Sequence, residues 1–345
     1  MMNSQLDESS KDLAYIKTFL GIIVAVIFVI ILKELQAIFL PFFMSVLLYF
    51  LFNGVVRQLL IYRIPMFVAL LFLLFFLFVV FYLFGVLIFS SVSSVSENFP
   101  KYSENITEML KGLTKNFDIP KLDSVLKSLE WRSIAPILTS TFGTFATFIG
   151  NIILVIIFLM FMLAGREGLV KRLNAAFSGE QADKILTLLN SIESQVQHYL
   201  LIKTAVSLMT ASISIVILLI GDVDFAIFSA LLIFILNFIP NFGSIAATAF
   251  PILVSIAQKG FTLEVLLIAS GLTATQMIIG NVVEPKITGK NLNISPLVIL
   301  MSLIIWGWIW GVIGMILAVP ITSALKIIFS HIKKLKPIAD LISAE

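Results

Sequence analysis

Long apolar runs, separated by short charged segments, dominate the chain from one end to the other. A helix needs about 20 mostly apolar residues to cross roughly 30 Å of hydrocarbon. We expect about eight membrane-spanning helices, at residues 15–32, 35–56, 65–90, 139–164, 204–220, 225–239, 261–283 and 297–325. The pattern therefore predicts an all-α polytopic membrane protein.

Two charged segments interrupt this apolar pattern, at residues 96–132 and 166–203. In both, hydrophobic residues recur at helical spacing among lysines and acidic residues. Such spacing is typical of a helix with one apolar face and one polar face. We expect amphipathic helices here that lie outside the bilayer core.

The uncharged run from Phe225 to Ala257 is too long for one upright crossing, because a single helix of that length would measure about 50 Å. It contains Pro240, Gly243 and Pro251, so we expect a break near Pro240 and a re-entrant segment from Pro240 to Pro251. The last run, Leu297 to Leu325, would measure about 43 Å. Its pattern leaves three alternatives open: a tilted helix, a broken helix or a second re-entrant hairpin.

These features divide the chain into six regions. They are an N-terminal three-span region (1–95), a polar amphipathic extramembrane segment (96–138), a fourth span (139–165), cytoplasmic amphipathic helices (166–203), a C-terminal core with interrupted helices (204–330) and a cytoplasmic tail (331–345).

Composition supports the membrane assignment, because only 12% of the residues are charged where a soluble domain has about a quarter. Basic clusters flank the apolar runs, and cytoplasmic loops are the ones enriched in Lys and Arg. This rule predicts that both termini are cytoplasmic. The net charge of +3 comes largely from these clusters and does not indicate a nucleic-acid partner.

The residue types limit the chemistry. The chain has no cysteine and two histidines, which are far apart in sequence, so we expect no metal site and no cofactor. Serine-hydrolase and metalloprotease motifs and a glycine-rich phosphate loop are absent. The sequence therefore predicts a protein that is not an enzyme.

Polar residues gather around the interruptions in the last third of the chain. A broken helix exposes backbone groups that protein, water or a ligand must satisfy, and transporters build binding sites in this way. The candidate residues of a substrate or ion pathway are Asn237, Pro240, Asn241, Gly243, Ser244, Gln276, Asn281, Glu284 and Pro285. The candidate packing or hinge residues are Pro251, Gly307, Gly311, Gly314 and Pro320.

Several of these residues have a structural alternative. Glu284 could pair with Lys286 or Lys290 at the membrane surface, although ionisable residues at membrane depth are commonly functional. Gln276 and Asn281 could serve only as hydrogen bonds between helices, and Gly307 and Gly311 only as a close-packing face.

Three motifs resemble those of one transporter family. Pro240-Asn-Phe-Gly243-Ser244 with Pro251, the string Gly280-Asn-Val-Val-Glu284-Pro285 through Gly289 to Pro296-Leu, and Gly307, Gly311, Gly314 and Ala-Val-Pro320 are similar to segments of the autoinducer-2 exporter (AI-2E) family. Ser295 stands where relatives often have His. The resemblance implies a multi-pass protein of the bacterial inner membrane, assembled from identical subunits, that acts by secondary transport or facilitated export.

Three functions remain open at this stage. The first is export of a small polar organic solute such as autoinducer-2, a quorum-sensing signal, and the second is a sodium or lithium/proton antiporter with Glu284 as proton carrier. The third is a membrane scaffold that binds a partner through residues 96–132 or 166–203. Besides the lipid bilayer and further copies of the chain, the expected partner is therefore a small molecule or a cation.

Overall fold

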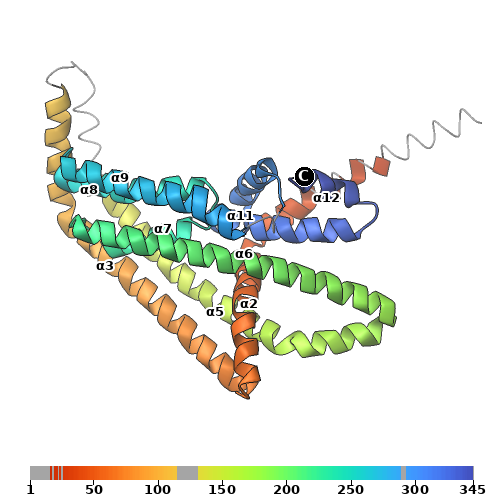
Figure 1. Cartoon of the computed structure of the whole chain (residues 1–345). Helices are drawn as coiled ribbons and strands as arrows, with labels where there is room; N and C mark the ends of the chain where they lie inside the picture. The colour runs from red at the N-terminus through yellow and green to blue at the C-terminus, as the bar shows by residue number, and fades with distance from the viewer. Residues whose placement is uncertain are drawn as a thin grey trace, which may run out of the picture.

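The computed structural model describes residues 26–114, 131–288 and 293–344, with several positions between 16 and 24, and in these ranges the fold is helical (Figure 1). The helices are α2 (Gln36–Ile61), α3 (Met66–Thr114), α5 (Trp131–Ala176), α6 (Gly179–Ile220), α7 (Ala226–Leu236), α8 (Phe242–Lys259), α9 (Leu263–Ile278), the π-helical turn η1 (Ile279–Val283), α10 (Glu284–Thr288), α11 (Pro296–His331) and α12 (Lys336–Ile342). Within the described ranges, six helices are long and apolar enough to cross a membrane, or up to seven if one bent pair counts as a span. This confirms the predicted all-α polytopic class.

α3 and α6 continue well beyond the spans that the sequence predicts. α3 has 49 residues and continues the predicted third span directly into the polar segment that follows it. α6 has 42 residues and joins the second half of the 166–203 segment to the span at 204–220, because no proline or glycine interrupts it after Gly179. The rest of the 96–132 segment, residues 115–130, lies outside the described residues.

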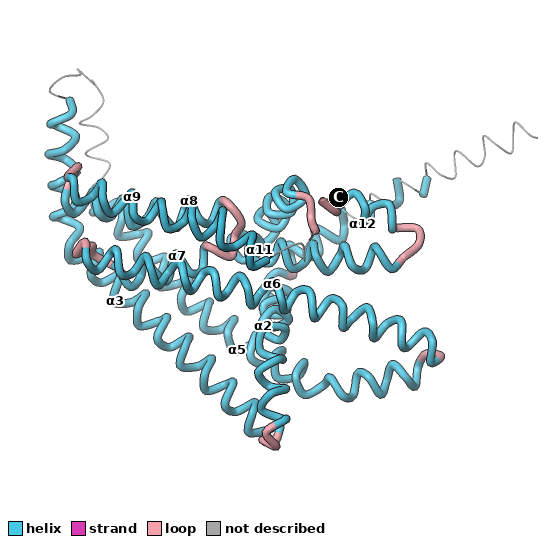
Figure 2. The backbone as a smooth tube through the Cα atoms, viewed as in Figure 1, coloured by secondary structure: helices cyan, strands magenta, loops and turns pink. Residues whose placement is uncertain are grey.

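α5 bends by 59° between Asn151–Gly165 and Gly168–Ala176, where the fourth span was predicted to end. After this bend, the end of α5 and the start of α6 run as a pair that projects to the right of the bundle in Figures 1 and 2. The charged part of this region therefore extends away from the apolar helices.

α7 and α8 form a helical hairpin with its closed end at residues 237–241. α7 has 11 residues, about 16 Å of helix, so the crossing predicted at 225–239 is instead one arm of this hairpin. Asn241 has a positive φ of 61°, and Gly243 lies so close to Leu236 that an added Cβ would be 1.7 Å from the Leu236 carbonyl oxygen. The predicted break near Pro240 is therefore the turn of the hairpin, and Pro251 is buried within its second arm.

α11 is a second helical hairpin, which decides among the three alternatives left open for the last apolar run. Gly311, with φ 64° and ψ −145°, interrupts the helix. Beyond it the chain folds back, since the hydroxyls of Ser302 and Thr322 are 2.5 Å apart, whereas 20 residues of straight helix would separate them by about 30 Å. Gly314 allows the close approach, because a Cβ there would lie 1.9 Å from the Trp306 carbonyl oxygen.

The two hairpins contact each other. Ile239, at the closed end of the α7–α8 hairpin, packs on Leu303 and Ala318 in the two arms of α11. Near Gly311, the Trp310 indole donates a hydrogen bond of 3.0 Å to the Leu32 carbonyl oxygen, which ties α11 to the N-terminal region. One side of each closed end is thus packed against another part of the protein.

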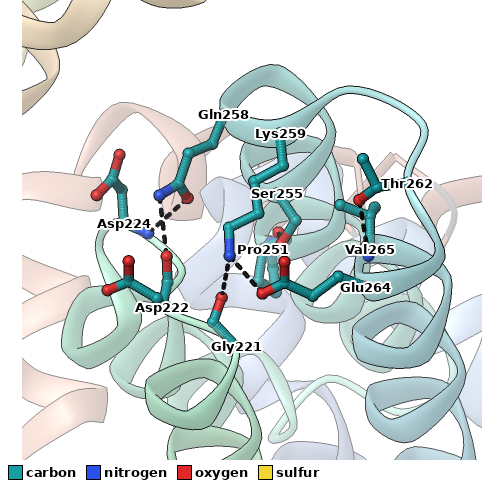
Figure 3. Close-up of polar contacts among 10 residues, drawn as sticks. All are labelled: Gly221, Asp222, Asp224, Pro251, Ser255, Gln258, Lys259, Thr262, Glu264 and Val265. Carbon is teal, nitrogen blue, oxygen red and sulfur yellow. Dashed lines mark hydrogen bonds and ion pairs between the residues drawn. The ribbon is translucent and has the colours of Figure 1, made fainter.

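A polar cluster fixes the open end of the α7–α8 hairpin (Figure 3). The Gln258 amide donates to the Asp222 carbonyl oxygen at 2.9 Å and accepts from the Asp224 backbone N–H at 3.0 Å. Lys259 Nζ donates to the Gly221 carbonyl oxygen at 2.7 Å and lies 2.5 Å from a Glu264 carboxylate oxygen. The end of α8 is therefore joined both to the α6–α7 turn and to α9.

The far end of α3 joins the same cluster. The Tyr102 hydroxyl donates to the Asp224 carboxylate at 2.5 Å, and the Asn105 amide donates to the carbonyl oxygens of Ala257 and Gln258, each at 3.1 Å. Burial, together with the bond to Asp224, raises the pKa of the Tyr102 phenol, so it stays a neutral donor at physiological pH. The α7–α8 hairpin is thus anchored to three other helices at its open end.

Replacing Gly311 by Ala should destabilise the fold, because its backbone conformation is one that only glycine adopts without strain. We expect a loss of about 1–3 kcal/mol in the free energy of unfolding. Gly314→Ala should also destabilise, by forcing the two arms of α11 apart. Gly168→Ala is the matched control, since a Cβ there meets no atom within 4 Å. Thermal unfolding in detergent measures the difference, and equal midpoints for the Gly311 and Gly168 variants would contradict the hairpin.

Candidate functional site

A cavity of about 470 Å³ lies between α6, the α7–α8 hairpin and the α9–η1–α10 segment. Its lining residues are Lys203, Val206, Thr210, Asn237, Ile239, Pro240, Asn241, Ser244, Ile245, Thr248, Ala249, Ile252, Thr273, Gln276, Met277, Ile279, Gly280, Asn281 and Glu284. The volume is that of a site for a small organic molecule.

Most of the pathway residues selected from the sequence meet at this cavity: Asn237, Pro240, Asn241, Ser244, Gln276, Asn281 and Glu284 line it. Two do not: Gly243 is buried beneath the hairpin turn, and Pro285 is exposed on α10. The candidate packing residues lie in the second arm of the first hairpin (Pro251) and in α11 (Gly307, Gly311, Gly314 and Pro320), and they do not line the cavity.

Two amide side chains connect opposite walls of the cavity. Gln276 Nε2 on α9 donates to Asn237 Oδ1 at 2.8 Å and to the Ser244 carbonyl oxygen at 3.3 Å. Asn237 and Ser244 lie on either side of the hairpin turn, so Gln276 holds this turn against α9. The hydrogen bond between helices that the sequence suggested for Gln276 is therefore present, and it lies within the cavity wall.

The π-helical turn η1 directly follows α9, the helix that carries Gln276. A π-helical turn accommodates an extra residue in the helix, and such turns are frequent at functional sites. Here Ile279, Gly280 and Asn281 of η1 and then Glu284 all line the cavity. The departure from α-helical geometry thus lies where Asn281 and Glu284 join the cavity wall.

Hydroxyl groups of the wall donate to the backbone of their own helices. Ser244 donates to the Asn241 carbonyl oxygen, Thr248 to that of Ser244 and Thr210 to that of Val206, at 2.7, 2.7 and 2.9 Å. Because each hydroxyl uses its one proton in this way, its oxygen remains a hydrogen-bond acceptor. The wall therefore combines hydroxyl acceptors with amide groups that both donate and accept.

One ion pair lines the cavity. Lys203 Nζ on α6 lies 2.5 Å from a Glu284 carboxylate oxygen, and the two side chains are 7% and 27% exposed. Lys286 and Lys290 are the partners that the sequence suggested for Glu284, but Lys286 is exposed on α10 and Lys290 lies outside the described residues. Glu284 is instead paired across the cavity wall, with a residue 81 positions earlier.

Lys203 was not among the residues selected from the sequence, because it is the last residue of the 166–203 segment, which was expected to lie outside the bilayer core. One signal could have found it: Lys203 is the single charged residue between His198 and Asp222. A lone ionisable residue within an apolar helix commonly faces a partner or a water-filled space. No group of three or more His, Cys, Asp or Glu side chains with the geometry of a metal site occurs in the described part of the chain.

Comparison with known proteins places the chain among transporters. Residues 20–334 match the model of the AI-2E transporter family. A putative transport protein of Borreliella burgdorferi is 31% identical over 320 residues, covering 92% of this chain and 88% of that protein. The AI-2 transport protein TqsA of Escherichia coli K12 is 30% identical over 314 residues, covering 89% of each chain. A putative transport protein of Haemophilus influenzae is 30% identical over 321 residues. The chain is therefore an integral membrane protein that belongs to the AI-2E family of transporters.

Proposed function

We propose that this protein is a secondary transporter that exports a small, neutral, polar organic solute, of the autoinducer-2 type, through the cavity between α6, the α7–α8 hairpin and α9. The observation that carries the proposal is the lining of the cavity, which has many amide and hydroxyl groups and one internally compensated ion pair. A neutral solute rich in hydroxyl groups needs such partners and needs no net charge from the protein. The name of the relative TqsA supports the type of solute.

The antiporter alternative receives less support from the geometry. A sodium or lithium ion needs several oxygen ligands, of which a carboxylate is the most effective. Glu284 is the one carboxylate among the lining residues, and Lys203 already occupies one of its oxygens. We therefore favour the organic solute as cargo.

The positive-inside rule supports a topology with both termini in the cytoplasm. A hairpin that enters and leaves the membrane on the same face returns the chain to the side from which it came. Treating the α7–α8 and α11 hairpins in this way keeps Arg57, Arg172 and Lys334 on the same side. The resemblance to the family also supports assembly of identical subunits.

Loss of the amides that join the cavity walls should impair transport. Gln276→Ala leaves the buried Asn237 amide without this partner and removes a group available to the solute. We expect about tenfold slower autoinducer-2 efflux, equivalent to roughly 1.4 kcal/mol, measured in membrane vesicles of defined orientation. The matched control is Ser270→Ala on the same helix, whose exposed hydroxyl only bonds the Leu267 carbonyl oxygen. Wild-type efflux by a folded Gln276→Ala protein would count against this cavity as the solute path.

The cavity should be open to water, and the absence of native cysteine allows a clean test. Single cysteines at Asn241 and Asn281, which line the cavity and are exposed, should react with a membrane-impermeant thiol reagent. A cysteine at Ser229, which is fully buried and does not line the cavity, should stay unreacted. Mass spectrometry of the labelled protein distinguishes the positions, and an unreactive Asn281→Cys variant would contradict an open cavity.

A further inference from the structure

The ion pair between Lys203 and Glu284 stands alone in an otherwise uncharged cavity. All the other lining residues are neutral, so removing either partner alone would leave the wall with a net charge. The Lys203 side chain is 7% exposed, and burying an ammonium at that depth is costly unless an opposite charge lies beside it. The two side chains are therefore one electrostatic unit.

A buried ion pair adds little net stability to the packing of two helices, because taking both charges out of water costs free energy. Replacing a buried ion pair with apolar residues of similar volume is often neutral or stabilising, whereas removing one partner leaves a charge uncompensated. The pair nevertheless lies in the wall of the cavity that we propose as the solute path. A second pair on α6, Lys184 with Glu180, is 73% and 82% exposed and lies away from the cavity, so solvent screens it.

We infer that Lys203 is a specificity-determining residue: it neutralises Glu284, so that the cavity excludes inorganic cations, while Glu284 in turn shields Lys203 from anions. This inference rests on the proposed function, since it names the feature that restricts the solute to neutral molecules. A cation entering the native cavity would have to displace an ammonium group from a distance of 2.5 Å. Specificity here comes from a repulsive or already satisfied group rather than from an added contact.

The inference makes opposite predictions for the two partners. In Lys203→Gln the Glu284 carboxylate faces the cavity alone, and sodium uptake should rise about tenfold over wild type. In Glu284→Gln the ammonium is alone, and chloride uptake should rise instead. The double variant Lys203→Gln/Glu284→Gln should exclude both ions again. Lys184→Gln, which breaks the exposed pair on the same helix, should behave as wild type.

The experiment measures uptake of ²²Na⁺ and ³⁶Cl⁻ into proteoliposomes that contain each full-length variant, with folding checked by gel filtration and thermal unfolding. Asn281→Asp adds a carboxylate to the exposed part of the cavity wall and keeps both partners of the pair. The one basic lining residue, Lys203, is already paired with Glu284. The Asn281→Asp variant should also gain sodium uptake. If a single-partner variant fails to fold, Asn281→Asp and the double variant decide the question.

Two results would overturn the inference. One is unchanged sodium uptake in folded Lys203→Gln and Asn281→Asp; the other is a double variant that takes up sodium as fast as Lys203→Gln. Failure of the proposed function is a separate result, because it would show as wild-type vesicles that move no organic solute while the ion uptakes still follow the charge of the cavity.

Discussion

Backbone N–H and C=O groups have no partner in the hydrocarbon of a membrane, so a helix can be interrupted there only where protein or water covers the break. This constraint explains how the C-terminal half of the chain is arranged. The break at Pro240 is covered on one side by α11, through Ile239, and opens on the other side to the cavity. The break at Gly311 lies beside Trp310, which bonds the backbone of the N-terminal region. Each interruption therefore determines what has to pack next to it.

The same constraint accounts for the polar character of the cavity. Residues that end α7 and begin α8 bring amides and carbonyl oxygens to one place, and Gln276 satisfies part of them from α9. What remains unsatisfied by the protein is available to water or to a solute. The charged part of the site is explained by charge compensation. Lys203 and Glu284 lie on two different helices, and each lowers the free-energy cost of burying the other.

Much of this arrangement could be predicted from the sequence. The uncharged run around Pro240 located the first interruption, and the polar residues on both sides of it, together with Gln276, Asn281 and Glu284, met at one cavity. The position of the break and the meeting of these side chains could be anticipated because proline, glycine and membrane-depth polar residues have local meaning, while their role in a solute path stays a prediction. α7 was predicted as a crossing because composition does not reveal where a helix turns back. For the last run, the conformation of Gly311 decides the path, and a glycine permits that conformation without requiring it. Lys203 was missed because its partner lies 81 positions away, and pairing at such a distance is a property of the fold.

The order of the cavity's residues along the chain has a consequence for biosynthesis. Every lining residue lies between positions 203 and 284, so the walls can meet as soon as that stretch has left the ribosome. The bond from Trp310 to Leu32, in contrast, closes a separation of 278 residues and must wait for nearly the whole chain. Contacts distant in sequence form late because closing a long loop costs more conformational entropy. A nascent chain would therefore hold a nearly complete solute site before α11 closes over its far side, and during that interval the uncovered end of the first hairpin is the surface that the insertion machinery or a chaperone must protect.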